Sequence, residues 1–158
     1  MKKQQKPMQL VRIETAIKAI KADNNNRVFL RNFAKALGVS LDEEITISPR
    51  NSQGHYNFGE IAECLLRLAN NQGGTKQSRG SVDLYLNGKP YEVKAINRDG
   101  KPSPTKGLDP KTPTLIVANL ASIQSGVYLL PYGEIVWNTS NHMVAKPTLE
   151  KAKLIKAI

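Results

Sequence analysis

Apolar residues in the first seventy positions recur with the period of an α-helix. Three segments show this pattern and are predicted to be helices: 9–22, 27–37 and 58–69. The apolar stripe of the first consists of Leu10, Ile13, Ile17 and Ile20. The polar run 24–26 separates the first two helices, and Gly38 is a typical helix stop. Ile61, Cys64, Leu65 and Leu68 share one face of the third helix, and a short strand is predicted over 45–47.

Beyond residue 80 the hydrophobic period changes from that of a helix to that of a strand. Strands are predicted over 81–86 and 89–96, and the Asn87-Gly88 pair between them is typical of a tight β-hairpin turn. Apolar runs predict two further strands over 114–118 and 127–130. A helical turn over 121–125, a strand over 134–137 and a terminal helix over 148–158 complete the prediction.

The predicted hairpin brings two carboxylates together. In a two-residue hairpin the cross-strand partners have a constant index sum, so Leu84 faces Tyr91 and Asp83 faces Glu92. Directly opposed residues have Cβ atoms about 4.5–5.5 Å apart. Lys94 is two residues beyond Glu92 and therefore lies on the same face. The opposite face is expected to pack on the core, and it carries Val82, Leu84, Leu86, Tyr91, Val93 and Ala95.

Opposed carboxylates repel each other, and a divalent cation removes that repulsion. Mg²⁺ prefers carboxylate oxygens, polarises phosphoryl oxygens and activates a bound water as a nucleophile. Lys94 would orient that water or stabilise charge developing on a phosphate. A solvated hairpin face, on which Lys94 partly neutralises the two acids, is the alternative that the spacing leaves open.

The charge of the chain points to a polyanionic partner. Among its 158 residues, 23 are Lys or Arg and 13 are Asp or Glu, which gives a net charge of +10. The excess of basic residues is concentrated in 1–41 and 76–111. Nucleic acid is the first partner to consider and an anionic membrane surface the second. A single cysteine excludes a disulfide scaffold, and one cysteine with the two isolated histidines His55 and His142 makes a zinc site unexpected.

We expect an intracellular protein, in the cytoplasm or nucleoid, without a membrane partner. No run of ~18 apolar residues is present that would cross a bilayer. The basic amino-terminus is not followed by the apolar core of a signal peptide.

Asp83, eight residues, then Glu92-Val93-Lys94 resembles the motif of the PD-(D/E)xK nuclease superfamily, with Val82 in place of the family's proline. This superfamily includes restriction endonucleases, Holliday junction resolvases and homing endonucleases. The predicted order of helix, hairpin, third strand and fourth strand resembles its core over about residues 58–130. The resemblance implies an α/β (α+β) fold, with a restriction-endonuclease-like αβββαβ core around a mixed central sheet. Residues 51–158 would form this core with the terminal helix, and 1–50 a basic helical extension for DNA contact or oligomerisation.

The resemblance also implies roles for individual residues. Asp83 and Glu92 would hold Mg²⁺, for which Mn²⁺ would substitute, with help from the Val93 backbone carbonyl, and Lys94 would be the catalytic lysine. A further metal ligand is expected on the first core helix, where Glu60 borders the apolar stripe and is preferred to Glu63. The chain would then be a divalent-metal-dependent endonuclease acting on DNA, without an organic cofactor. It would act as a homodimer or higher homo-oligomer where both strands are cut.

Basic and polar residues in three places are candidates for contact with the DNA backbone. One group is on the second predicted helix, one precedes the Asp83 strand and one is on the long loop over 97–112. They are Arg27, Arg31 and Lys35; Lys76, Gln77 and Arg79; and Arg98, Lys101, Lys106 and Lys111. A non-catalytic nucleic-acid-binding module on the same scaffold, and a small basic structural or ribosome-associated protein, are the alternatives.

Overall fold

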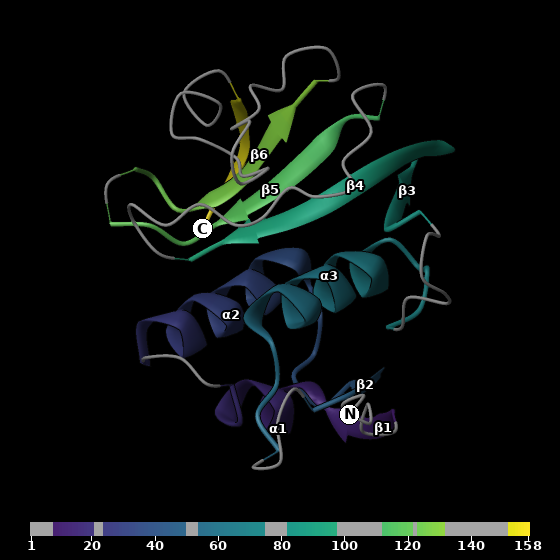
Figure 1. Cartoon of the computed structure of the whole chain (residues 1–158), viewed down its shortest axis with the longest axis vertical. Helices are drawn as coiled ribbons and strands as arrows, with labels where there is room; N and C mark the ends of the chain where they lie inside the picture. The colour runs from purple at the N-terminus through teal and green to yellow at the C-terminus, as the bar shows by residue number, and fades with distance from the viewer. Residues whose placement is uncertain are drawn as a thin grey trace, which may run out of the picture. The chain divides into compact units, whose positions relative to one another are not determined.

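The computed structural model describes residues 8–20, 24–49, 54–74, 82–97, 112–121, 123–131 and 152–158. The chain forms two compact units, Met1–Ser81 and Val82–Ile158. The first unit contains β1 (Gln9–Arg12), α1 (Ile13–Lys18), α2 (Asn24–Leu37), β2 (Glu44–Ile47) and α3 (Phe58–Ala69) (Figure 1). The second contains β3 (Leu84–Leu86), β4 (Lys89–Ile96), β5 (Thr114–Ala118), β6 (Gly126–Leu130) and β7 (Lys153–Ala157).

The helices of the first unit pack on one another around an apolar core. Its fully buried side chains include Ile13 and Ile17 of α1, Leu30 and Phe33 of α2, and Ile61 and Leu65 of α3. The Phe29 ring lies beside those of Phe33 and Phe58, with centroid separations of 5.7 and 5.8 Å. The apolar stripes that predicted the helices are therefore the residues that hold them together.

Two of the three predicted helices are confirmed. The first is wrong at both ends, because α1 covers only Ile13–Lys18 and Ile20 forms an isolated β-bridge with Tyr56. α3 has the predicted bounds and begins at Asn57, whose side chain accepts a hydrogen bond from the Glu60 amide at 3.2 Å. α2 begins three residues earlier than predicted and ends at Gly38, whose φ of +73° favours glycine.

The segment expected to open the first helix forms β1 instead. It pairs antiparallel with β2, and of these two strands only β2 was predicted. Leu10, which was assigned to the apolar stripe of the helix, is 66% exposed. The backbone amides of Ile13 and Glu14 donate to the carbonyls of Glu43 and Leu41 at 2.9 and 3.1 Å. The amides at the start of α1 are thus satisfied by the chain before β2, and the shorter helix begins where that pairing ends.

The second unit is a mixed sheet with the strand order β3-β4-β5-β6-β7. β4 and β5 run parallel, and the other neighbours run antiparallel. The hairpin register is the predicted one, with Leu84 opposite Tyr91 and Leu86 opposite Lys89. Asn87 and Gly88 have φ values of 51° and 79°, as the tight turn requires. The mixed α/β class and the mixed central sheet are confirmed.

The predicted terminal helix is wrong, because its final residues form β7. β7 pairs antiparallel with β6 and gives β6 a second hydrogen-bonded neighbour. Gly126 allows the close approach, since a Cβ there would overlap the Lys156 carbonyl oxygen. The helical turn expected over 121–125 is also absent from its described residues. The strand predicted over 134–137 lies outside the described part of the chain.

Within the described ranges, no helix has the length and apolarity needed to span a membrane.

Candidate active site

Asp83 sits at the open end of the β3–β4 hairpin. The β-ladder ends at the Leu84–Tyr91 pair, and Asp83 occupies the next position, in a bend just before β3. Its carboxylate Oδ2 accepts a hydrogen bond from the Val93 backbone amide at 3.0 Å. Asp83 is only 3% exposed, so it is buried and not part of a solvated hairpin face. The side chain thus replaces a strand carbonyl as the partner of a buried amide of β4.

The Val93 carbonyl lies on the same side of β4 as Asp83. Along β4 the main-chain polar groups of successive residues point to alternate neighbouring strands. The Glu92 amide donates to the Pro113 carbonyl at 3.0 Å, toward β5, whereas the Val93 amide donates toward Asp83. Since the amide and carbonyl of one strand residue point the same way, the Val93 carbonyl is directed to the edge where Asp83 lies.

Glu92 and Lys94 occupy alternate positions of β4 and share one face of the sheet. Both are half-buried. Their registered neighbours on β5 are Thr114 and Ile116, and Thr114 is fully buried. Three polar side chains, Glu92, Lys94 and Thr114, therefore occupy adjoining positions at one corner of this face.

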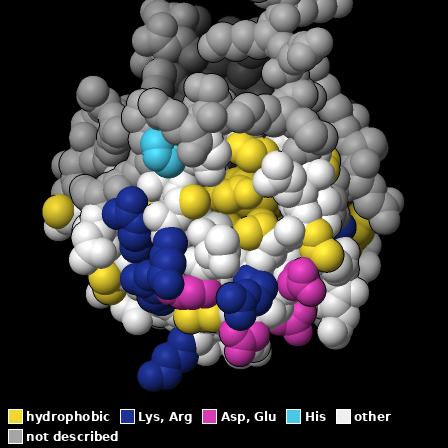
Figure 2. Space-filling view, turned by 90° about the horizontal axis from the view of Figure 1, so that it is seen from below, with side chains coloured by type: hydrophobic (Ala, Val, Ile, Leu, Met, Phe, Trp, Pro, Cys, Tyr) yellow, Lys and Arg dark blue, Asp and Glu magenta, His cyan; other side chains and the backbone are white. Residues whose placement is uncertain are grey.

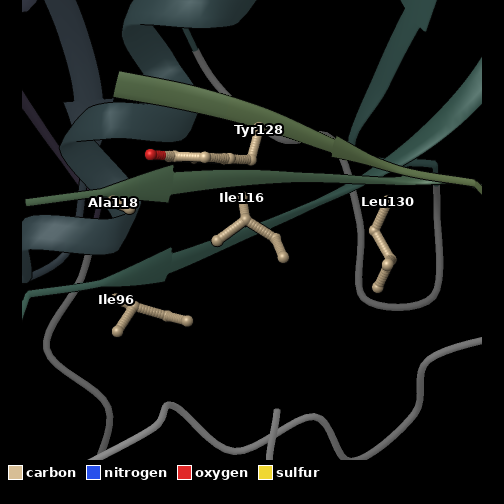
Figure 3. Close-up of a cluster of buried hydrophobic side chains, with 5 residues drawn as sticks. All are labelled: Ile96, Ile116, Ala118, Tyr128 and Leu130. Carbon is tan, nitrogen blue, oxygen red and sulfur yellow. The ribbon is translucent and has the colours of Figure 1, made fainter. Parts of the chain in front are cut away.

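The rest of the same face is apolar. Ile96, Ile116, Ala118, Tyr128 and Leu130 form a buried cluster that continues from the polar corner across β4, β5 and β6 (Figure 3). Tyr128 donates its hydroxyl to the Gln124 carbonyl at 2.5 Å, and burial raises its pKa above the ordinary value. Leu84 and Val93, on the face that was expected to pack on the core, are buried, and every residue of β5 is buried as well, so the sheet buries side chains on both faces.

The oxygen donors that meet at the hairpin mouth fit a hard divalent cation. The Asp83 carboxylate accepts from the Val93 amide, Glu92 directly precedes Val93 on β4, and the Val93 carbonyl is directed to the edge where Asp83 lies. Mg²⁺ takes one or two carboxylates and completes its shell with water, so a large protein cage is not required. Among the described residues there is no group of three or more His, Cys, Asp and Glu side chains suited to a metal.

Glu60 and Glu63 lie on α3 in the first unit, and both are half-buried. Both carboxylates act on the Cys64 thiol of the same helix: burial raises its pKa to about 12, and the negative charges of Glu63 and Glu60 add to the effect. The assignment of Glu60 as an auxiliary metal ligand, and the preference for it over Glu63, stay predictions.

The predicted DNA-contacting residues of α2 recur every four positions along the helix. Arg31 forms a two-pronged ion pair with Glu14 of α1, with Nη2–Oε1 at 3.0 Å and Nε–Oε2 at 3.2 Å. Arg27 donates from Nη2 to the Ile20 carbonyl at 3.0 Å, whereas Lys35 is exposed. Arg27 and Arg31 therefore connect α2 to the α1 segment, whatever further contact they make.

Figure 2 shows Lys and Arg side chains gathered on one face of the first unit, with acidic side chains beside them. DNA contact by Arg27, Arg31 and Lys35 stays a prediction. The other residues predicted to contact DNA lie outside the described ranges: Lys76, Gln77, Arg79, Arg98, Lys101, Lys106 and Lys111.

Thr114 is the polar residue at this site that the sequence did not reveal. In the sequence it opens an apolar run and reads as the edge of a buried strand. Its position beside Glu92 depends on the parallel pairing of β4 with β5, which involves residues more than twenty positions apart. The rule of a constant index sum, which predicted the hairpin pairing, does not apply to parallel strands, so the sequence does not predict the register of β4 and β5.

Comparison with models of protein families, with curated proteins and with solved structures found no match. The activity of the chain must therefore be inferred from the chemistry of the residues that the fold brings together.

Proposed function

We propose that the protein is a divalent-metal-dependent endonuclease that hydrolyses phosphodiester bonds in DNA. The observation that carries the proposal is the hairpin mouth, where the buried Asp83 carboxylate accepts from the Val93 amide of β4, and Glu92 and Lys94 flank Val93 on that strand. A net charge of +10 supports a polyanionic substrate.

Asp83, Glu92 and the Val93 carbonyl would hold the cation. When bound there, Mg²⁺ supplies an activated water and polarises a phosphoryl oxygen. The chain's own contribution to catalysis is to hold the oxygen atoms that would bind the cation in fixed positions. The hydrogen bond from Val93 restrains the Asp83 carboxylate. The β3–β4 ladder includes Tyr91 and the β4–β5 ladder begins at Glu92, so strand pairing fixes the backbone before and after Glu92. Such restraint keeps the site in one geometry before the substrate arrives.

Lys94 would stabilise the negative charge that develops on the phosphoryl group. It is half-buried, and its registered neighbour Ile116 is fully buried in the apolar cluster. A charge beside apolar side chains is screened less than one in water, so its attraction for a phosphate oxygen is stronger. The Cα atoms of Lys94 and Glu92 are two strand steps, roughly 6.6 Å, apart.

A homodimer or higher homo-oligomer is proposed with this activity, because cutting both strands of a duplex requires two active sites. The chain would then contact DNA through the basic residues of its first unit and of residues 76–111.

The test is cleavage of supercoiled plasmid, branched DNA and structured RNA in Mg²⁺, Mn²⁺ or EDTA. Asp83→Asn and Lys94→Ala should each lower the rate at least about 100-fold, in line with the loss of one charge-stabilising group. Lys89→Ala is the matched control, since Lys89 is exposed on the same strand but on the opposite face. It should cut like the wild type.

Cleavage that survives in EDTA, or that persists in both active-site variants, would contradict the proposal. Salt-sensitive DNA binding without cleavage of any substrate, including a genomic library that covers rare sites, would favour the non-catalytic binding module.

A further inference from the structure

Thr114 carries a buried hydroxyl that the fold of the second unit does not use. The residue is fully buried, and its Oγ1 has no hydrogen-bond partner among the residues that the structure describes. A buried hydroxyl without a partner destabilises a protein, and valine would fill the same space without that cost. A threonine at this position is therefore explained if its hydroxyl forms a hydrogen bond when a ligand is bound to the protein.

The register places this hydroxyl beside the proposed site. Thr114 is the direct neighbour of Glu92 in the parallel ladder, and strands in a sheet lie about 4.8 Å apart. Registered residues of neighbouring strands project from the same face. On the other side, the registered neighbour of Thr114 is Leu130, which has no polar side-chain atom. Glu92 is thus the polar side chain that registers with Thr114.

We propose that Thr114 is a positioning residue for Glu92, an inference that rests on the proposed metal-dependent activity. When a divalent cation is bound, the Thr114 hydroxyl donates its hydrogen to the Glu92 carboxylate. The bond holds one carboxylate oxygen and leaves the other directed at the cation. Carboxylates that bind metals are commonly held by such outer hydrogen bonds, and losing one lowers metal affinity about 10- to 100-fold.

The experiment measures Mn²⁺ binding to the full chain by titration calorimetry, without DNA, together with thermal unfolding in EDTA. Thr114→Val should fold at least as stably as the wild type and bind Mn²⁺ about 10- to 100-fold more weakly. Thr114→Ser keeps the hydroxyl and should restore binding to near the wild-type value. The matched control is Thr46→Val, the same substitution on β2 of the first unit, which should leave Mn²⁺ affinity unchanged.

A second pair of variants tests the hydroxyl without valine, whose packing could itself change the Mn²⁺ affinity. Thr114→Ser and Thr114→Ala both lack the methyl group and differ only in the hydroxyl, so equal Mn²⁺ affinities of the two would overturn the inference. Wild-type affinity in Thr114→Val would overturn it as well. Absence of Mn²⁺ binding to the wild type would instead refute the proposed function and this inference together. Binding by the wild type with no effect at Thr114 refutes the inference alone.

Discussion

Replacing Asp83 by asparagine and by alanine separates the two roles of its carboxylate. Asp83 is 3% exposed and accepts the Val93 amide at 3.0 Å, and Val93 is itself buried. Alanine removes the acceptor and leaves a buried amide without it, which costs about 1–3 kcal/mol. Asparagine keeps one oxygen in nearly the same place, replaces the other by an amino group and removes the negative charge. In EDTA, we expect Asp83→Ala to be less stable than Asp83→Asn by at least about 1 kcal/mol.

Adding Mg²⁺ then tests the metal role with the same variants. A ligand present at 100 times its dissociation constant stabilises the folded protein by about 2.7 kcal/mol. The wild type should gain this amount, whereas both Asp83 variants should gain little, because one of the two carboxylate ligands is lost. Urea unfolding followed by circular dichroism measures both effects.

Two results would refute this reasoning about Asp83. Equal stability of the alanine and asparagine variants in EDTA would mean that the hydrogen bond to Val93 contributes nothing to the fold. An undiminished gain from Mg²⁺ in either variant would mean that Asp83 does not bind the cation. Glu43→Gln is the control for loss of one negative charge, since Glu43 is exposed and precedes β2 in the first unit.

Three further predictions concern packing and charge. Gly126→Ala should destabilise the protein by about 1–3 kcal/mol in urea unfolding, because the new methyl group would overlap the Lys156 carbonyl oxygen between β6 and β7. Cys64 should react slowly with a disulfide reagent at pH 8 and rapidly once unfolded, because burial raises its pKa to about 12 from 9.0. The pKa of Cys64 is higher in the folded than in the unfolded protein, so the stability that its buried thiol contributes is complete below pH 9 and is lost as pH rises toward 12. Cys64→Ala should therefore lose less stability than the wild type between pH 9 and pH 12. A double-mutant cycle on Arg31 and Glu14 should give a coupling energy of about 0.5–1 kcal/mol that decreases with salt, because the pair is bidentate and partly exposed.

The control for Gly126→Ala is the same substitution at Gly38 of the first unit. Gly38→Ala adds a methyl group where nothing lies within 4 Å, so only its φ of +73° opposes the change, at about 1–2 kcal/mol. A Gly126→Ala variant as stable as the wild type would contradict the close approach of the β6 and β7 backbones at Gly126. Rapid labelling of Cys64 in the folded protein would contradict its burial. A coupling energy near zero for Arg31 and Glu14 would mean that the pair does not join α1 to α2.

Local interactions explain which parts of the fold the sequence predicts. The Asn87-Gly88 turn fixes the hairpin register, since each pairing from Leu86–Lys89 to Leu84–Tyr91 follows from a two-residue turn. α3 is equally local, with an apolar stripe inside its own twelve residues and an asparagine cap. The predicted bounds of α3, 58–69, and of β4, 89–96, agree with the structure to the residue.

Pairing between distant segments explains what the sequence did not predict. β1 and β7 contain residues whose spacing also suits a helix, and each becomes a strand because a partner far along the chain, β2 or β6, accepts its hydrogen bonds. The register that brings Thr114 to Glu92 is of the same kind. The burial of Asp83 was also missed, because alternation alone assigns it to the polar face.

The central claim is that Asp83, Glu92 and Val93 hold a divalent cation at the hairpin mouth, and Fe²⁺ locates such a site directly. Fe²⁺ occupies oxygen sites that take Mg²⁺ or Mn²⁺, and with ascorbate and peroxide it cuts the polypeptide next to where it is bound. The account predicts cuts near residues 83 and 92–94, suppressed by excess Mg²⁺ and absent from Asp83→Asn. Cuts confined to other segments, or cuts at the hairpin that persist in Asp83→Asn, would contradict it.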